Sequence, residues 1–92
     1  MCEGDLRVQS FTYTIKDEMG LHARPAGQMV KRIKSLPAQV TIRCGERSAD
    51  GRKLFAIMAM AVNQGETVTV EVDGEGEEAL RDELLEFFEA NY

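Results

Sequence analysis

The residues best suited to chemistry lie in one short segment, Gly20-Leu21-His22-Ala23-Arg24-Pro25-Ala26. His22 is the only histidine of the 92-residue chain, and Arg24 follows two positions later. A neutral imidazole is a nucleophile, and a guanidinium binds phosphate through several N–H donors. If His22 is the N-cap of a helix, Pro25 falls in the first turn, where its missing N–H costs no hydrogen bond. The segment therefore predicts a nucleophilic histidine at a helix start.

The start of a helix changes what the His22 ring can do. The positive end of the helix dipole and the guanidinium of Arg24 both disfavour a positive charge on the ring, so we expect a neutral imidazole with a free lone pair. Once the ring carries an anionic group, the unpaired backbone N–H groups of Ala23 and Arg24 can bind that group. Phosphoryl transfer needs mainly positioning and charge stabilisation, which a shallow site can supply. The alternative is an exposed cap histidine without a role.

A second segment, from Leu54 to Val62, is a run of nine apolar residues. Such a run predicts a helix that is hydrophobic all round, and a chain of this length cannot bury every side of it. An exposed apolar patch with a basic rim is typical of a docking surface, whereas the alternative is a short, fully buried helix. The expected patch and its rim comprise Leu54, Phe55, Met58, Arg52 and Lys53.

Composition limits the class of protein. Hydrophobic residues make up 43% and charged residues 29%, which is typical of globular proteins, and the length predicts one domain over residues 1–92. No apolar run approaches the roughly 20 residues of a membrane span, and the acidic N-terminus lacks the hydrophobic region of a signal peptide. We therefore expect no membrane insertion and a cytoplasmic protein.

Several kinds of site are not predicted. The chain has neither a GxxxxGK[ST] nor a GxGxxG motif, so no nucleotide-binding loop is indicated. His22 and the distant Cys2 and Cys44 do not have the spacing of a zinc site. Two cysteines are too few for a disulfide framework, and we expect both thiols to be reduced. We expect neither a metal nor a cofactor.

Charge is distributed unevenly along the chain. The net charge is -5, which argues against a nucleic-acid partner. Residues 20–53 carry eight basic and two acidic side chains, whereas residues 71–89 carry nine acidic side chains and one basic. The alternatives are two solvated surfaces without a role, or a basic surface that attracts an acidic partner and an acidic surface that repels the wrong partner.

The spacing of apolar residues predicts four strands and three helices in the order β-α-β-β-α-β-α. Strands are expected over residues 7–15, 39–44, 47–49 and 67–72. One helix should run from Ala23 until Pro37 stops it, a second over residues 54–62, and a third should carry Leu80, Leu84, Phe87 and Phe88 on one face. Asp50 can cap the second helix. Because each strand has one apolar side, the expected fold is an open-faced, two-layer α+β sandwich with three helices on one face of a four-stranded antiparallel sheet.

These features together resemble HPr, the histidine-containing phosphocarrier protein family of the phosphoenolpyruvate-dependent sugar phosphotransferase system. The resemblance covers nearly the whole chain and rests on the His22 segment, the Leu54-Phe55 pair, Asn63-Gln64-Gly65 and the element order. It implies that His22 takes a phosphoryl group on Nδ1 from phosphorylated enzyme I and passes it to a IIA domain of a sugar transporter. Such a protein is a phosphohistidine carrier rather than a true enzyme.

The resemblance also assigns roles to the surrounding residues. Arg24 matches the family's active-site arginine, and Leu54, Phe55 and Met58 match its hydrophobic docking helix. Many members carry a regulatory serine just before the Leu-Phe-type pair, but this chain has Lys53 there, so control by phosphorylation of that serine is not expected. A monomer is expected because partners need the surface.

Two other functions stay open on the same fold. One is a regulatory protein-binding module that uses the Leu54-Phe55-Met58 surface to control an enzyme or a transcription regulator. The other keeps the chemistry of His22 but serves a nitrogen-regulatory or dihydroxyacetone-kinase relay in place of sugar uptake.

Overall fold

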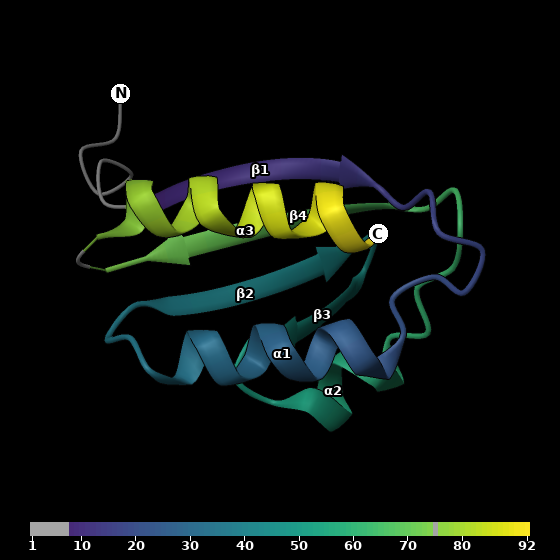
Figure 1. Ribbon diagram of the computed structural model, residues 1–92, viewed down its shortest axis with the longest axis horizontal. Helices are drawn as coiled ribbons and strands as arrows, with labels where there is room; N and C mark the ends of the chain where they lie inside the picture. Colours follow the sequence, from purple (N-terminus) through teal and green to yellow (C-terminus); the bar gives the residue numbers. More distant parts are fainter. Residues whose placement is uncertain (1–7, 75) are drawn as a thin grey trace.

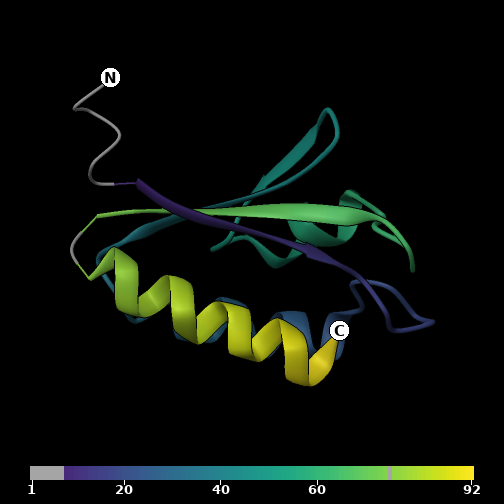
Figure 2. The same ribbon diagram turned by 90° about the horizontal axis from the view of Figure 1, so that it is seen from above.

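The computed structural model describes residues 8–74 and 76–92, so the predictions for Cys2 and Arg7 lie outside the described residues. The elements in chain order are β1 (Val8–Thr14), α1 (Ala23–Lys34), β2 (Gln39–Cys44), β3 (Arg47–Asp50), α2 (Leu54–Ala59), β4 (Thr67–Asp73) and α3 (Glu77–Asn91). The predicted order is confirmed. Seen along the sheet, α1 and α3 lie on one side of it (Figure 2), and α2 packs beside α1 and against β3.

The four strands form one antiparallel sheet in the order β1-β4-β2-β3. In the central strand β4, Val70 is paired with Phe11 of β1 on one side and with Ile42 of β2 on the other. Side chains alternate across a strand, so Val68, Val70 and Val72 face the helices while the residues between them face outward. The predicted open-faced sandwich is therefore confirmed.

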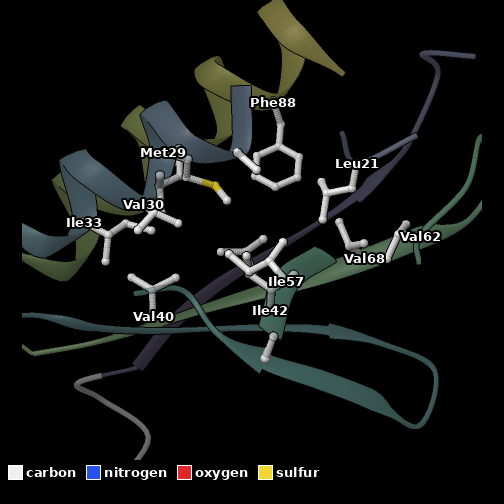
Figure 3. Close-up of a cluster of buried hydrophobic side chains, with 14 of the residues drawn as sticks. Leu21, Met29, Val30, Ile33, Val40, Ile42, Ile57, Val62, Val68 and Phe88 are labelled. Atoms are coloured by element: carbon white, nitrogen blue, oxygen red, sulfur yellow. The ribbon is translucent and has the colours of Figure 1, made fainter. Parts of the chain in front are cut away.

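The core lies between the sheet and the two long helices. The α1 residues at the predicted helical spacing are all buried, as are Leu80, Leu84 and Phe88 of α3. Figure 3 shows Met29 and Phe88 reaching from the helices toward the sheet, where Ile42 and Val68 point back at them. This shared core holds the start of α1 and the end of α3 at fixed positions over the sheet.

The second helix is shorter than predicted. It ends at Ala59, with Met60 as its C-cap, and Ala61 has a positive φ of 52°. A left-handed residue ends an α-helix because it turns the chain out of the helical path. The chain then returns Met60 and Val62 to the core, which explains why the apolar run continues beyond the helix.

The predicted cap of the second helix is also wrong. The N-cap is Lys53, which makes no side-chain cap hydrogen bond. The Asp50 carboxylate instead accepts a hydrogen bond from the backbone N–H of Arg52 at 2.9 Å. The backbone carbonyl of Asp50 accepts a second one from the backbone N–H of Lys53 at 3.0 Å. Asp50 therefore stabilises the turn that precedes the helix, because an aspartate readily bonds the backbone two residues ahead.

None of the helices formed by residues 8–74 and 76–92 has the length and apolar character needed to cross a membrane.

Candidate functional site

His22 occupies the N-cap position of α1, as the sequence predicts. Its backbone is extended, with φ -90° and ψ 167°, and helical geometry begins at Ala23. The loop before it depends on Gly20, which has a φ of +69° and lies so close to Val62 that an added Cβ would be 2.3 Å from the Val62 carbonyl oxygen. The N–H of Leu21 donates to the same oxygen at 3.0 Å. The loop is thus fastened to the chain that follows α2, and only glycine fits at its tightest point.

Tyr92, the residue directly after α3, packs against His22. Its hydroxyl donates to the backbone oxygen of His22 at 3.1 Å, and the two rings meet edge to face with centroids 5.7 Å apart. The backbone oxygen of Tyr92 accepts hydrogen bonds from the N–H groups of Lys16 and Asp17. In Figure 1 the end of α3, marked C, lies beside the loop that leads into α1. The residue that follows α3 therefore anchors the histidine loop at both ends.

The Tyr92 hydroxyl is a permanent donor in this arrangement. Burial, and to a lesser degree the nearby Asp17 carboxylate, raises the pKa of Tyr92 far above its ordinary value. The hydroxyl consequently keeps its proton and its hydrogen bond to His22 at all physiological pH values.

The two nitrogens of the His22 ring have different surroundings. The side chain is 23% exposed, yet Nε2 is buried and has no hydrogen-bond partner in the part of the chain that the structure describes. Asp17 Oδ2 lies 3.5 Å from Nε2. Nδ1 makes no hydrogen bond within the described residues and is not one of their buried unpartnered atoms, so this nitrogen is not fully buried. The arrangement leaves Nδ1 accessible to an approaching molecule.

Donors for an anion lie beside this ring. The N–H of Ala26 bonds the His22 carbonyl at 3.3 Å, whereas those of Ala23 and Arg24 bond no acceptor within residues 8–74 and 76–92. The first turn of α1 contains no acidic residue, and the exposed Arg24 side chain makes no ion pair in the described part of the chain. A helix start with free N–H groups favours a bound anion.

A shallow groove of about 620 Å³ lies between α1 and α2. Its floor is apolar, and its rim is basic without an acidic residue. The lining residues are Gly27, Val30, Lys31, Lys34, Arg52, Lys53, Leu54, Phe55 and Ala56. Phe55 is 86% exposed, whereas Ile57, two positions later, is fully buried. An exposed phenylalanine within a basic rim is typical of a surface that binds another protein.

Not every predicted docking residue contributes equally. Leu54 and Met58 are only partly buried, but Met58 does not line the groove. The Arg52 guanidinium donates to the backbone oxygens of Leu36 and Ala38, so it supports the chain after α1 as well as forming the rim.

The sequence did not lead us to predict two residues that contact His22, namely Asp17 and Tyr92. Tyr92 carries a signal that could have found it, since Leu84, Phe88 and Tyr92 recur every four residues and continue the buried face of α3. Nothing in the local pattern identifies Asp17, because its contact with His22 depends on how the loop folds. Within the described residues, no group of three or more histidine, cysteine or acidic side chains could hold a metal ion.

A family model described as the phosphorylation site of the HPr component of the phosphotransferase system matches residues 9–90. The chain belongs to the HPr family. The phosphocarrier protein HPr of Haemophilus influenzae is 38% identical over 66 residues, which are 72% of this chain and 78% of that protein.

Solved HPr structures share the fold. An HPr structure from Thermoanaerobacter tengcongensis superposes with a TM-score of 0.82 at 28% identity, covering 89% of this chain and 92% of that one. An HPr from the same organism that is described as a dimer has a TM-score of 0.69 at 29% identity, covering 87% of this chain and 92% of that one. The chain is thus a member of a family of phosphocarrier proteins.

Proposed function

We propose that His22 accepts a phosphoryl group from phosphorylated enzyme I and passes it to a IIA domain of a sugar transporter. The observation that carries this proposal is the ring itself, which exposes Nδ1 beside two free backbone N–H groups at a helix start. Membership of the HPr family supports it, and residues 1–92 are taken as one domain of that family.

The transfer uses groups that the chain supplies. The lone pair on Nδ1 attacks the phosphorus, and the bond between phosphorus and the donor breaks as the new N–P bond forms. The N–H groups of Ala23 and Arg24 and the Arg24 guanidinium then stabilise the added negative charge. The IIA acceptor reverses these events, with its own nucleophile attacking the same phosphorus. No cofactor is needed for either step.

The groove between α1 and α2 provides the docking surface in this proposal. Partner proteins would cover Phe55 and Leu54, while Lys31, Lys34 and Lys53 attract acidic side chains around them. A shallow site needs such a partner, because the partner excludes water from the transferring phosphoryl group. We propose that the protein acts as a cytoplasmic monomer, since a permanent contact on this surface would compete with both partners.

A second function is supported by the exposure of Phe55. This residue could anchor a regulated enzyme or transcription factor without any transfer from His22. Lys53 stands where many HPr proteins have a regulatory serine, so such control would not depend on phosphorylation there. A nitrogen-regulatory or dihydroxyacetone-kinase relay would use the same site chemistry with other partners.

Phosphorylation in vitro tests the main proposal. The protein is incubated with phosphoenolpyruvate and enzyme I, and intact mass spectrometry should show one added phosphate that is labile in acid and stable in base. The His22→Ala variant should gain none. A phosphate that survives acid, or one that appears on His22→Ala, would refute the role of His22. Full biological function of His22→Ala would favour the regulatory module.

A further inference from the structure

We propose that Asp17 is a positioning residue that keeps the ring proton on Nε2 of His22, so that the Nδ1 lone pair faces the phosphoryl donor. This inference deepens the proposed function and rests on it for the transfer step alone. The placement of the proton is a property of the unphosphorylated protein and can be measured separately.

The surroundings of Nε2 point to Asp17. This nitrogen is buried, and no hydrogen-bond partner within residues 8–74 and 76–92 reaches it. Asp17 is the one acidic residue of the described chain with a carboxylate oxygen within 4 Å of a nitrogen of the ring, and its Oδ2 lies 3.5 Å from Nε2. The separation exceeds a hydrogen bond, so the carboxylate acts through its charge, and contacts of this kind commonly shorten when a partner binds. A negative charge beside Nε2 favours an N–H there over a lone pair.

The Asp17 carboxylate is itself held in place. Oδ1 accepts a hydrogen bond from the backbone N–H of Met19 at 2.8 Å. The backbone N–H of Asp17 donates to Tyr92 at 2.8 Å, and its carbonyl accepts from Gly20 at 2.9 Å. With Oδ1 and both backbone groups engaged, Oδ2 is left to face the ring. Tyr92 limits the ring from another side through its edge-to-face contact.

The other charged groups near the ring do not compete for Nε2. Lys16 extends over the Tyr13 ring, with Nζ 5.9 Å from its centroid. Arg24 is exposed at the helix start. Tyr92 stays uncharged because burial raises its pKa. Asp17 is thus the charge that decides which nitrogen of His22 carries the proton.

The role of Asp17 continues after phosphorylation. When Nδ1 attacks, the N–P bond forms, the donor bond breaks, and Nε2 keeps its proton, so the ring becomes a phosphorylated imidazolium whose positive charge faces Asp17. When the phosphoryl group leaves, the electrons of the N–P bond return to Nδ1 and a neutral ring remains. No proton has to enter or leave in either direction.

The Asp17→Asn variant tests the inference. Asparagine can still accept from Met19 through Oδ1, but it presents an NH₂ donor toward Nε2 in place of a carboxylate oxygen. We expect nitrogen-15 NMR of the unphosphorylated protein to show mostly the Nε2–H tautomer in the wild type and a marked gain of the Nδ1–H tautomer in the variant. Phosphorylation by enzyme I should then slow by about tenfold or more.

The Glu18→Gln variant is the matched control. Glu18 is the exposed neighbour of Asp17, and its replacement removes the same charge without a group facing the ring. It should leave both the tautomer ratio and the transfer rate within twofold of the wild type. An unchanged tautomer ratio in Asp17→Asn, with the loop intact by NMR, would overturn the inference. Failure of wild-type phosphorylation would instead overturn the proposed function, because the tautomer measurement needs no phosphate.

Discussion

The two ring nitrogens of His22 have opposite surroundings. One ring nitrogen is enclosed beside a carboxylate, and the other lies open beside free backbone donors. A histidine that accepts a phosphoryl group and then passes it on needs a fixed ring and an accessible lone pair. It must not bind the phosphoryl group too tightly, because tight binding would block the second transfer. Arg24 suits this requirement since it is exposed and makes no ion pair in the described part of the chain, so it can contact the phosphoryl group without first breaking another contact.

Replacing Arg24 with alanine should slow transfer without unfolding the protein. Loss of the guanidinium removes a charge-assisted donor to the phosphoryl group, so we expect kcat/KM for phosphorylation by enzyme I to fall about 10- to 100-fold. Urea unfolding should be unchanged because the side chain is exposed. Arg24→Lys should recover part of the rate, since lysine keeps the charge but not the planar fork. Wild-type rates in Arg24→Ala would remove this residue from the site.

Among the helices and loops, the site depends on the ends of α1 and α3. The start of α1 supplies the N–H groups, and the residue after α3 carries the ring that supports His22. The loop between β1 and α1 reaches this position by fastening Gly20 and Leu21 to Val62. Three segments distant in the sequence therefore converge at one histidine.

Gly20→Ala should disrupt this convergence. Residue 20 has a positive φ, and a Cβ there would lie 2.3 Å from the Val62 oxygen. We expect a loss of more than about 2 kcal/mol in the free energy of unfolding, measured in urea, together with slower phosphorylation. The matched control is Gly27→Ala in α1, where a Cβ meets nothing within 4 Å. That variant should gain about 0.5–1 kcal/mol, because alanine is the better helix former. Equal stabilities of the two variants would contradict the close approach at Gly20.

Because of Tyr92, we expect the stability of the fold to depend on pH in the alkaline range. Folding raises the pKa of its hydroxyl, mainly through burial. The unfolded chain therefore ionises first, so the free energy of unfolding is unaffected below about pH 10 and falls as the pH rises above it. Tyr92→Phe should lack this part of the loss while costing about 1 kcal/mol at neutral pH through the missing hydrogen bond. Urea unfolding between pH 8 and 11 measures both effects. If Tyr13→Phe, the control, changed the curve equally, the effect could not be assigned to Tyr92.

The charge of the entire protein is divided between surfaces. The basic segment of residues 20–53 supplies the groove between α1 and α2, whereas the acidic segment of residues 71–89 supplies α3. Among the described residues, two ion pairs join different elements: Arg32 of α1 lies 2.6 Å from Glu83 of α3, and Arg43 of β2 lies 3.1 Å from Glu71 of β4. Lys31, Lys34 and Lys53 make no ion pair among the described residues, so their charge is available to a partner.

Neutralising one of these lysines should slow association. Lys34→Gln removes a charge from the groove, and we expect the kcat/KM of phosphorylation by enzyme I to fall about two- to fivefold at low salt, with a smaller difference at 0.5 M salt. Arg43→Gln is the matched control, since it changes the net charge equally on the sheet face opposite the helices. If the two variants lost rate equally, net charge rather than the groove would attract the partner.

Local sequence patterns were sufficient to predict most of the fold and part of the site. The spacing of Ala26, Met29, Val30 and Ile33 identifies the buried face of α1, and Pro25 places the helix start at His22. These predictions hold because helix and strand periods are properties of neighbouring residues. The apolar run from Leu54 was less informative, since a helix and the chain that follows it can both be apolar when both are buried.

Tertiary structure decided which groups surround the histidine. Asp17 is close to His22 in sequence, but its carboxylate faces the ring because Met19, Gly20 and Tyr92 bond the loop into one shape. Tyr92 lies 70 residues from His22, and no local pattern pairs them. The length of α2 depends likewise on the left-handed turn at Ala61, which returns Val62 to the core. Neighbouring residues establish which side of an element is buried, whereas contacts across a loop arise only when distant segments pack on the same core.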